Sequence, residues 1–261
     1  YHGRDVTILD VFEAVGAHNA GKMTDEELAE LENVASPGAG ACGAQFTANT
    51  MACAFEALGI SPGGSAMVPA EDDEKDTVAE KIGELVMQVL ADDLRPSRII
   101  TRESLENAIA TICASGGSTN GVLHLLAVAK EAGVPLEMAD FERISRQTPL
   151  FADMKPGGRY VATDLYRAGG VPLILSRLSE AGLLHRDQIT VSGRTIGEEA
   201  DAADEAPGQD VVRPAADPVK DAPASERRHR LERRTARATG AWLRPPRSLI
   251  KPQCDKRDSK T

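Results

Sequence analysis

The chain has 261 residues, carries a formal net charge of −10 and contains only 3% aromatic residues. This length allows one or two domains with a sizeable core, which must consist mainly of Leu, Val, Ile, Ala and Met side chains. No run of 18 apolar residues occurs, which argues against a membrane-spanning helix, and no signal peptide is visible. The chain starts with Tyr1 rather than Met, so we expect it to be a piece of a longer protein.

Apolar residues recur at helical spacing in five segments, which predicts helices over residues 47–58, 74–91, 102–113, 120–132 and 171–181. Three of them are followed by a glycine at the position where a helix commonly ends: Gly59, Gly133 and Gly182. The second segment has a predicted apolar face of Val78, Ile82, Leu85, Val86 and Val89. In the fourth segment, the residues predicted to face the core are Val122, Leu123, Leu126 and Ala129.

Three short apolar segments between these helices are candidate strands, namely residues 65–68, 98–100 and 189–191. Helices that alternate with strands are typical of the α/β class, and we expect a layered α/β/α domain over residues 1–200. From about residue 201 the periodicity fades into Asp-, Ala- and Pro-rich sequence. This composition predicts an interdomain linker over residues 201–224.

The four cysteines, Cys42, Cys53, Cys113 and Cys254, are irregularly spaced and form no C-x-x-C pair. Such spacing is not that of a disulfide framework and favours a reducing compartment, so we expect a cytoplasmic protein. Cys53 and Cys113 lie on helical patterns among apolar neighbours. We therefore expect these two side chains to pack as small hydrophobic groups.

Cys42 has a different setting, the glycine-rich stretch PGAGACGAQFTANTM of residues 37–51, which runs directly into a predicted helix. Small residues allow a tight turn with exposed N–H groups, and the helix adds a partial positive charge near the sulfur. Both effects favour the thiolate, which is the form that binds metal or attacks an electrophile. On local grounds alone, simple packing of Cys42 is an equally good interpretation.

The same stretch contains the pattern G-x-G-x-x-G from Gly38 to Gly43. This dinucleotide-binding motif requires a preceding strand. Here the preceding residues predict a helix, with a capping box formed by Thr24 and Glu27, and Pro37 interrupts the approach. The context therefore argues against nucleotide binding.

A second small-residue loop, Ser115-Gly-Gly-Ser-Thr-Asn120, precedes the predicted helix 120–132. Unpaired N–H groups in such a loop can hold a carboxylate or phosphate oxygen. The alternative is an ordinary helix cap, which is favoured when the loop is considered alone. For the turn Lys155-Pro-Gly-Gly-Arg-Tyr160, a solvated loop is favoured over contact with an anionic substrate.

Four blocks in order resemble the dihydroxy-acid dehydratase family, which includes sugar-acid dehydratases such as phosphogluconate dehydratase. They are residues 5–18 with Gly21-Lys-Met23, the Cys42 loop from Gly40 to Met51, residues 114–120 with Leu123-His-Leu125, and residues 152–160 continuing through Gly169-Gly-Val-Pro172 to Gly182-Leu-Leu-His185. The resemblance extends to about residue 220. The first block is more similar to the branched-chain amino-acid enzyme than to the sugar-acid branch.

The resemblance implies a hydro-lyase that converts a 2,3-dihydroxy acid to a 2-keto acid. In this family an iron–sulfur cluster held by three cysteines acts as a Lewis acid on the departing hydroxyl, and Mg²⁺ binds the substrate carboxylate and C2 oxygen. A serine in a second domain takes the C2 proton. One metal thus stabilises the leaving group and the other the developing enolate.

Carried over to this sequence, Cys42 matches the third cluster cysteine, and no catalytic residue transfers. The resemblance places the other two cysteines and the Mg²⁺ ligands before Tyr1, and the serine base in a C-terminal β-rich domain that is absent. One ligand loop serves a [2Fe–2S] or a [4Fe–4S] cluster equally. Ala44 stands where the family usually has glycine, and Cys254-Asp-Lys256 repeats a family motif in the wrong place, which we interpret as chance.

The last 36 residues differ chemically from the rest. Residues 226–261 carry 12 Lys or Arg against 4 Asp or Glu, whereas the preceding residues carry 18 against 36. The resemblance ends at about residue 224, so residues 225–261 are interpreted as an aberrant, disordered tail produced by a shift of reading frame. The alternative, a basic arm that binds nucleic acid nonspecifically, is supported by weaker signals.

The sequence therefore predicts part of a dihydroxy-acid dehydratase of valine and isoleucine biosynthesis, acting on a small dihydroxy acid. We expect no specific nucleic-acid partner, and the family resemblance implies a homodimeric parent enzyme. The alternatives are a sugar-acid dehydratase and a truncated product without catalytic activity. We expect this chain alone to be inactive, because one thiolate cannot retain a cluster that needs three.

Overall fold

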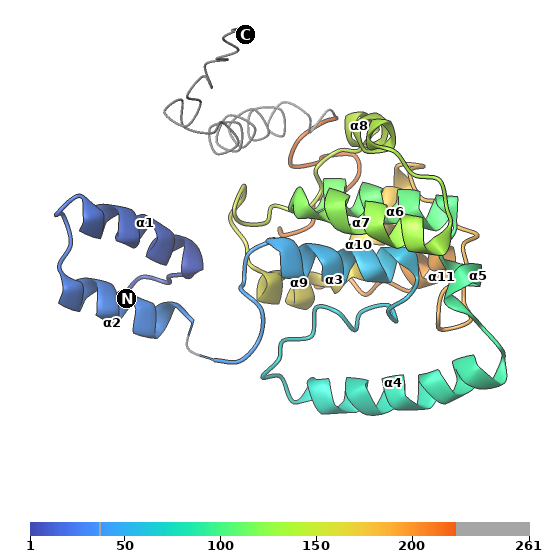
Figure 1. Ribbon diagram of the computed structural model, residues 1–261, viewed down its shortest axis with the longest axis horizontal. Helices are drawn as coiled ribbons and strands as arrows, with labels where there is room; N and C mark the ends of the chain where they lie inside the picture. The colour runs from blue at the N-terminus through green and yellow to red at the C-terminus, as the bar shows by residue number, and fades with distance from the viewer. Residues whose placement is uncertain (37, 223–261) are drawn as a thin grey trace, which may run out of the picture. The chain divides into compact units, whose positions relative to one another are not determined.

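The computed structural model describes residues 1–36 and 38–222, whose regular secondary structure is helical (Figure 1). Strand pairing in this described part is limited to isolated β-bridges. The basic tail with Cys254 lies outside the described residues. The helices of the described part are α1 (Ile8–Asn19), α2 (Asp25–Ala35), α3 (Thr47–Leu58), α4 (Glu74–Ala91), α5 (Pro96–Ile99), α6 (Arg102–Ala114), α7 (Asn120–Ala132), α8 (Met138–Gln147), α9 (Ala162–Ala168), α10 (Gly170–Glu180) and α11 (Ile196–Asp201).

The five predicted helices are confirmed. α3, α4 and α7 have the predicted bounds, α6 is one residue longer, and α10 begins and ends one residue earlier. α3 and α7 end at Gly59 and Gly133, whose φ angles of +86° and +67° place both in the left-handed region. Glycine adopts this conformation without steric cost, which is why it marks the helix ends in the sequence.

The three predicted strands are not formed in the described residues, so the layered α/β/α arrangement is not seen there. Residues 65–68 form turns, because the Glu56 carboxylate accepts two backbone N–H groups at 2.7 and 2.8 Å and holds the chain in a bend. Residues 98–100 complete the short helix α5, which Pro96 starts in a position favourable to proline. Ile189 forms only an isolated bridge across a tight turn. Short apolar runs fit helix, strand or turn, and here tertiary contacts decide.

The main core is built around α6, which contacts α3, α7, α8 and α10 (Figure 1). Ten of its thirteen residues are buried, so the helix has almost no solvent-facing side. Its buried polar groups are satisfied: the Asn107 amide exchanges two hydrogen bonds with the backbone of His185, at 3.0 and 2.8 Å. The Thr111 hydroxyl donates to the Asn107 carbonyl at 2.9 Å. α6 is therefore a rigid support for the loops at its two ends.

α1 and α2 pack against each other around a second, smaller cluster of Val11, Ala14 and Leu31. Both helices start with a capping box, and the box of Thr24 and Glu27 is the one that the sequence predicts. Because a helix rather than a strand precedes the glycine-rich stretch, the structural context of a dinucleotide-binding motif is not present there.

α4 has the predicted length but not the predicted burial. None of its residues is buried, and Val86 and Leu90 are 58% and 72% exposed. α7 differs in one position, since Leu123 is 67% exposed while Leu125 is fully buried. A period of 3.6 residues identifies an apolar stripe, but it does not identify what covers that stripe.

Residues 201–222, which the composition predicts to be a linker, pack along the domain. Val212 is fully buried and its neighbour Ala152 pairs with it in an isolated bridge, while Leu150 pairs with Lys220. Arg177, nearly buried in α10, binds Glu205 of this segment at 2.6 Å. Residues 201–222 are therefore part of the same folded unit as the helices α1 to α11.

Candidate functional site

Cys42 lies in the loop that leads into α3, and its side chain is half-buried. The main chain around it is fixed by Asn49 in the first turn of α3. The Asn49 side-chain amide donates to the carbonyl oxygens of Cys42 at 2.5 Å and of Ala44 at 2.8 Å. Phe46, the N-cap residue of α3, provides no side-chain cap. The positive end of the helix dipole is thus directed to the loop without a capping carboxylate or hydroxyl.

The turn of residues 115–120 packs directly against this segment. The backbone N–H of Ser118 donates to the Thr50 hydroxyl at 2.8 Å, and the Asn120 side chain donates to the Thr47 hydroxyl at 2.7 Å. Gln45, which is buried, donates to the Ser115 hydroxyl at 3.1 Å. The two small-residue loops that the sequence predicts as separate candidates therefore form one structural unit.

The N–H groups of this turn are largely used within the protein. Those of Gly116 and Gly117 bind carbonyl oxygens at the end of α6, and that of Asn120 binds the Ser118 hydroxyl at 3.2 Å. Such contacts are those of a helix end, and the Ser118 hydroxyl accepts the first N–H of α7, whereas the N-cap residue Thr119 makes no side-chain cap. They favour the capping interpretation of residues 115–120 over an anion-binding loop.

The turn of residues 155–160 and the residues after it contact the part of the loop that follows Cys42. The Gln45 N–H donates to the Lys155 carbonyl, and the Ala162 N–H donates to the Gly43 carbonyl, both at 2.7 Å. Arg159 is held by an ion pair with Asp210 at 2.8 Å. This turn therefore supports the Cys42 loop through its backbone, a role that its sequence does not indicate.

Cys53 and Cys113 are fully buried in the main core, which confirms that they pack as hydrophobic groups. Burial raises the pKa of the Cys53 thiol to about 12, so Cys53 remains a neutral thiol at physiological pH. Among the cysteines that the structure describes, Cys42 is the one that is not buried. It is therefore the candidate ligand on the basis of exposure as well as sequence.

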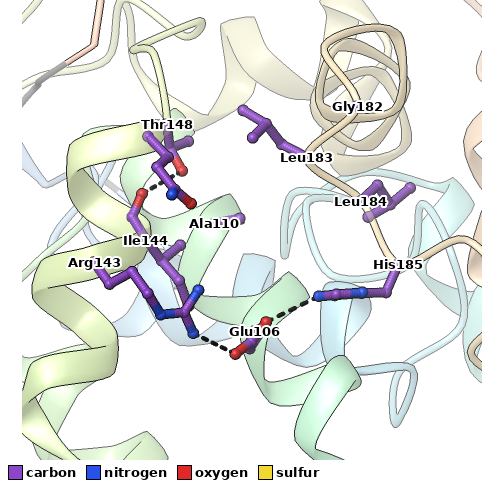
Figure 2. A pocket seen from close by; sticks show the side chains of 10 residues that line it. Glu106, Ala110, Arg143, Ile144, Thr148, Gly182, Leu183, Leu184 and His185 are labelled. Atoms are coloured by element: carbon purple, nitrogen blue, oxygen red, sulfur yellow. Dashed lines mark hydrogen bonds and ion pairs between the residues drawn. The ribbon is translucent and has the colours of Figure 1, made fainter.

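A separate pocket of about 190 Å³ lies between α6, α8 and the loop after α10 (Figure 2). Glu106 projects into it and binds Arg143 at 2.5 Å and His185 at 2.9 Å. Burial by itself would raise the pKa of Glu106, but hydrogen bonds from His185, Arg143 and Arg102 outweigh it. The pKa is therefore lowered, and the group is ionised and paired. Glu106 is nine residues from Ser115, or about 13 Å along α6, so this pocket is distinct from the Cys42 loop.

An iron–sulfur cluster needs several thiolate ligands, and the Cys42 loop fits one of them. A thiol in a glycine-rich loop with backbone N–H groups nearby is a favourable cluster ligand. In residues 1–36 and 38–222, no group of three or more His, Cys, Asp or Glu side chains converges to hold a metal ion. The described part of the chain thus contains no complete metal site.

Residues 2–199 match the family model described as Dihydroxy-acid/6-phosphogluconate dehydratase N-terminal. The chain belongs to this family. Dihydroxy-acid dehydratases of Koribacter versatilis, Roseiflexus sp. and Thermus thermophilus are 60%, 56% and 52% identical to it. Each match covers 84% of this chain but 38–40% of the relative, so the chain spans about two-fifths of the length of these proteins.

The matched region contains the Cys42 loop and both supporting turns. The relatives named above are hydro-lyases by their names, and the predicted family membership is confirmed. Among the described helices, none is both long enough and apolar enough to cross a membrane.

Proposed function

We propose that this chain is the N-terminal part of an iron–sulfur hydro-lyase of valine and isoleucine biosynthesis. Its substrates are 2,3-dihydroxy-3-methyl carboxylic acids, which it dehydrates to 2-keto acids, and Cys42 is one of the thiolate ligands of the cluster. The observation that carries the proposal is the half-buried Cys42 thiol in a loop whose backbone is bound by Asn49 and by the turn before α9. Because the chain belongs to the dehydratase family, this geometry supports a role of Cys42 as a cluster ligand.

The cluster, when bound, supplies a Lewis-acidic iron for a departing hydroxyl. The contribution of this chain is to present the Cys42 sulfur from a fixed loop at the start of α3. The buried amide of Gln45 and the Thr50 hydroxyl connect that loop to the 115–120 turn. A Mg²⁺ ion, a homodimeric assembly and a cytoplasmic location belong to the same proposal, by resemblance to the family.

A chimera tests the proposal. The matched segment of the Koribacter versatilis dehydratase is replaced with the corresponding 220 residues of this chain, which are 60% identical to it. We expect the chimera to form 2-keto acid from 2,3-dihydroxyisovalerate and to carry the visible absorption of an iron–sulfur cluster. Cys42→Ser should abolish both, whereas Cys53→Ala, at a buried position, should retain them.

The comparison of substrates separates the two enzyme classes. A chimera that prefers gluconate-type acids would support the sugar-acid alternative and contradict the branched-chain assignment. A Cys42→Ser chimera with a complete cluster would show that Cys42 is not a ligand.

The chain alone requires a different measurement. We expect the 261-residue protein, after anaerobic reconstitution, to lack stoichiometric iron and sulfide and to form no keto acid. A stoichiometric cluster together with keto-acid formation would contradict the expectation that this chain is inactive by itself.

A further inference from the structure

Asn49 is buried, with 7% of its surface exposed, yet its amide is directed to the loop before α3. The carbonyl oxygens of Cys42 and Ala44 lie 2.5 and 2.8 Å from its Nδ2 atom. Because both neighbours are acceptors, the NH₂ group and not the oxygen must face them. Each of its two N–H bonds can then serve one carbonyl.

One amide group thus binds two carbonyls that are two residues apart, which fixes the conformation of the backbone between them. Two glycines flank Cys42 in this loop, Gly40 with a φ of +117° and Gly43. Glycine permits the turn but leaves the unfolded loop many conformations. Asn49 therefore supplies an order that the glycines cannot.

On the N-terminal side of the cysteine, the Ala39 N–H donates to the Glu71 carboxylate at 3.1 Å. The remaining contacts lie after the cysteine. The turn at 155–162 binds the backbone of Gly43 and of Gln45, and Thr50 binds the Gln45 carbonyl. In the described part of the chain, Asn49 is the side chain with a hydrogen bond to the backbone of Cys42 itself.

We propose that Asn49 is the positioning residue of the Cys42 loop and holds the Cys42 sulfur in place for ligation. The role in ligation depends on the function proposed above, whereas the ordering of the loop does not. Ligands must be held within about 0.5 Å of their productive position by supporting groups. Loss of the two hydrogen bonds should therefore loosen the cysteine while α3 and the core remain folded.

The test uses the full chain with Cys254→Ser and a nitroxide spin label on Cys42. Cys53 and Cys113 are buried, so the folded chain is labelled at Cys42. Asn49→Asp keeps the shape of the side chain but removes both donors. Its matched control is Asn107→Asp, which makes the same change at a buried asparagine that binds the His185 backbone instead.

We expect the room-temperature spectrum of the label to become more mobile in Asn49→Asp and to stay unchanged in Asn107→Asp. Hydrogen exchange in residues 41–46 should become about tenfold faster in Asn49→Asp alone, the effect of losing about 1.4 kcal/mol of hydrogen bonding. If Asn49→Asp does not fold, Asn49→Ser, which cannot reach both carbonyls, replaces it.

An unchanged spectrum and unchanged exchange in a folded Asn49 variant would overturn the proposal. Equal loosening in the Asn107 control would also overturn it, because the effect would then be one of general stability. The outcome is independent of cluster binding. Failure of the Cys42→Ser chimera test would therefore refute the ligand assignment and leave the ordering role of Asn49 to be judged by these spectra.

Discussion

Gly117 provides the sharpest test of how the 115–120 turn is held against α3. A Cβ atom at this position would lie 2.9 Å from the Thr50 Cγ2 atom and 3.1 Å from the Ile112 Cγ2 atom. Thr50 cannot rotate away freely, because its hydroxyl accepts from the Ser118 N–H and donates to the Gln45 carbonyl. Gly117→Ala must therefore displace the turn or break these bonds.

Overpacking of this kind costs about 1–3 kcal/mol, and a lost buried hydrogen bond adds about 1 kcal/mol. We expect Gly117→Ala to lower the free energy of unfolding by about 2 kcal/mol or more, seen as a Tm lower by about 4–8 °C. Urea denaturation followed by circular dichroism measures the first quantity and a thermal scan the second.

Gly83→Ala is the matched control, because a Cβ atom there meets no other group within 4 Å and the residue lies inside the exposed helix α4. Alanine is the better helix former, so this variant should be more stable by up to about 1 kcal/mol. A Gly117→Ala variant within about 0.5 kcal/mol of the parent would refute the close packing of the turn on Thr50.

Three further predictions concern Glu56, Val212 and Leu90. Burial raises the pKa of Glu56 to about 7 from its usual 4.5, so the folded state holds this proton more tightly than the unfolded state. The stability that Glu56 contributes is complete below about pH 4.5 and is lost as the pH rises through 7. The difference in urea midpoint between the parent and Glu56→Gln should therefore change across this range, and a constant difference would contradict the prediction. Val212→Ala should cost about 2 kcal/mol in urea denaturation, because two buried methyl groups are removed from the core, whereas a loose linker would show no change. Leu90→Gln, at a position 72% exposed, should alter the free energy of unfolding in urea denaturation by less than about 0.5 kcal/mol, and a larger loss would mean that α4 is covered in solution.

The helices could be predicted because their signals are local. Gly59 and Gly133 adopt conformations that other residues rarely adopt, and Thr24 with Glu27 forms a box within one turn. The predicted strands are not formed because residues distant in the sequence decide the conformation of these short apolar segments. Residues 65–68 bend on account of Glu56, which lies about ten residues earlier and whose carboxylate no periodicity takes into account.

The candidate site was predictable only in part. Cys42 could be singled out, because glycine, cysteine and a helix start are adjacent in the sequence. The support from residues 155–162 could not, since it consists of backbone hydrogen bonds between segments more than a hundred residues apart. The role of Asn49 could not be predicted either, because its partners are backbone carbonyls of the preceding loop and the sequence does not show which carbonyls a side chain reaches.

The Cys42 loop is held by hydrogen bonds within the folded domain. Its carbonyls and N–H groups bind Asn49 and the turn before α9, and the Gln45 side chain binds Ser115 in the turn after α6. A loop that only a metal could order would use part of the binding free energy for folding, as in metal-dependent small domains. Here the backbone at position 42 is set in advance, so a cluster that binds Cys42 loses little affinity to ordering this ligand.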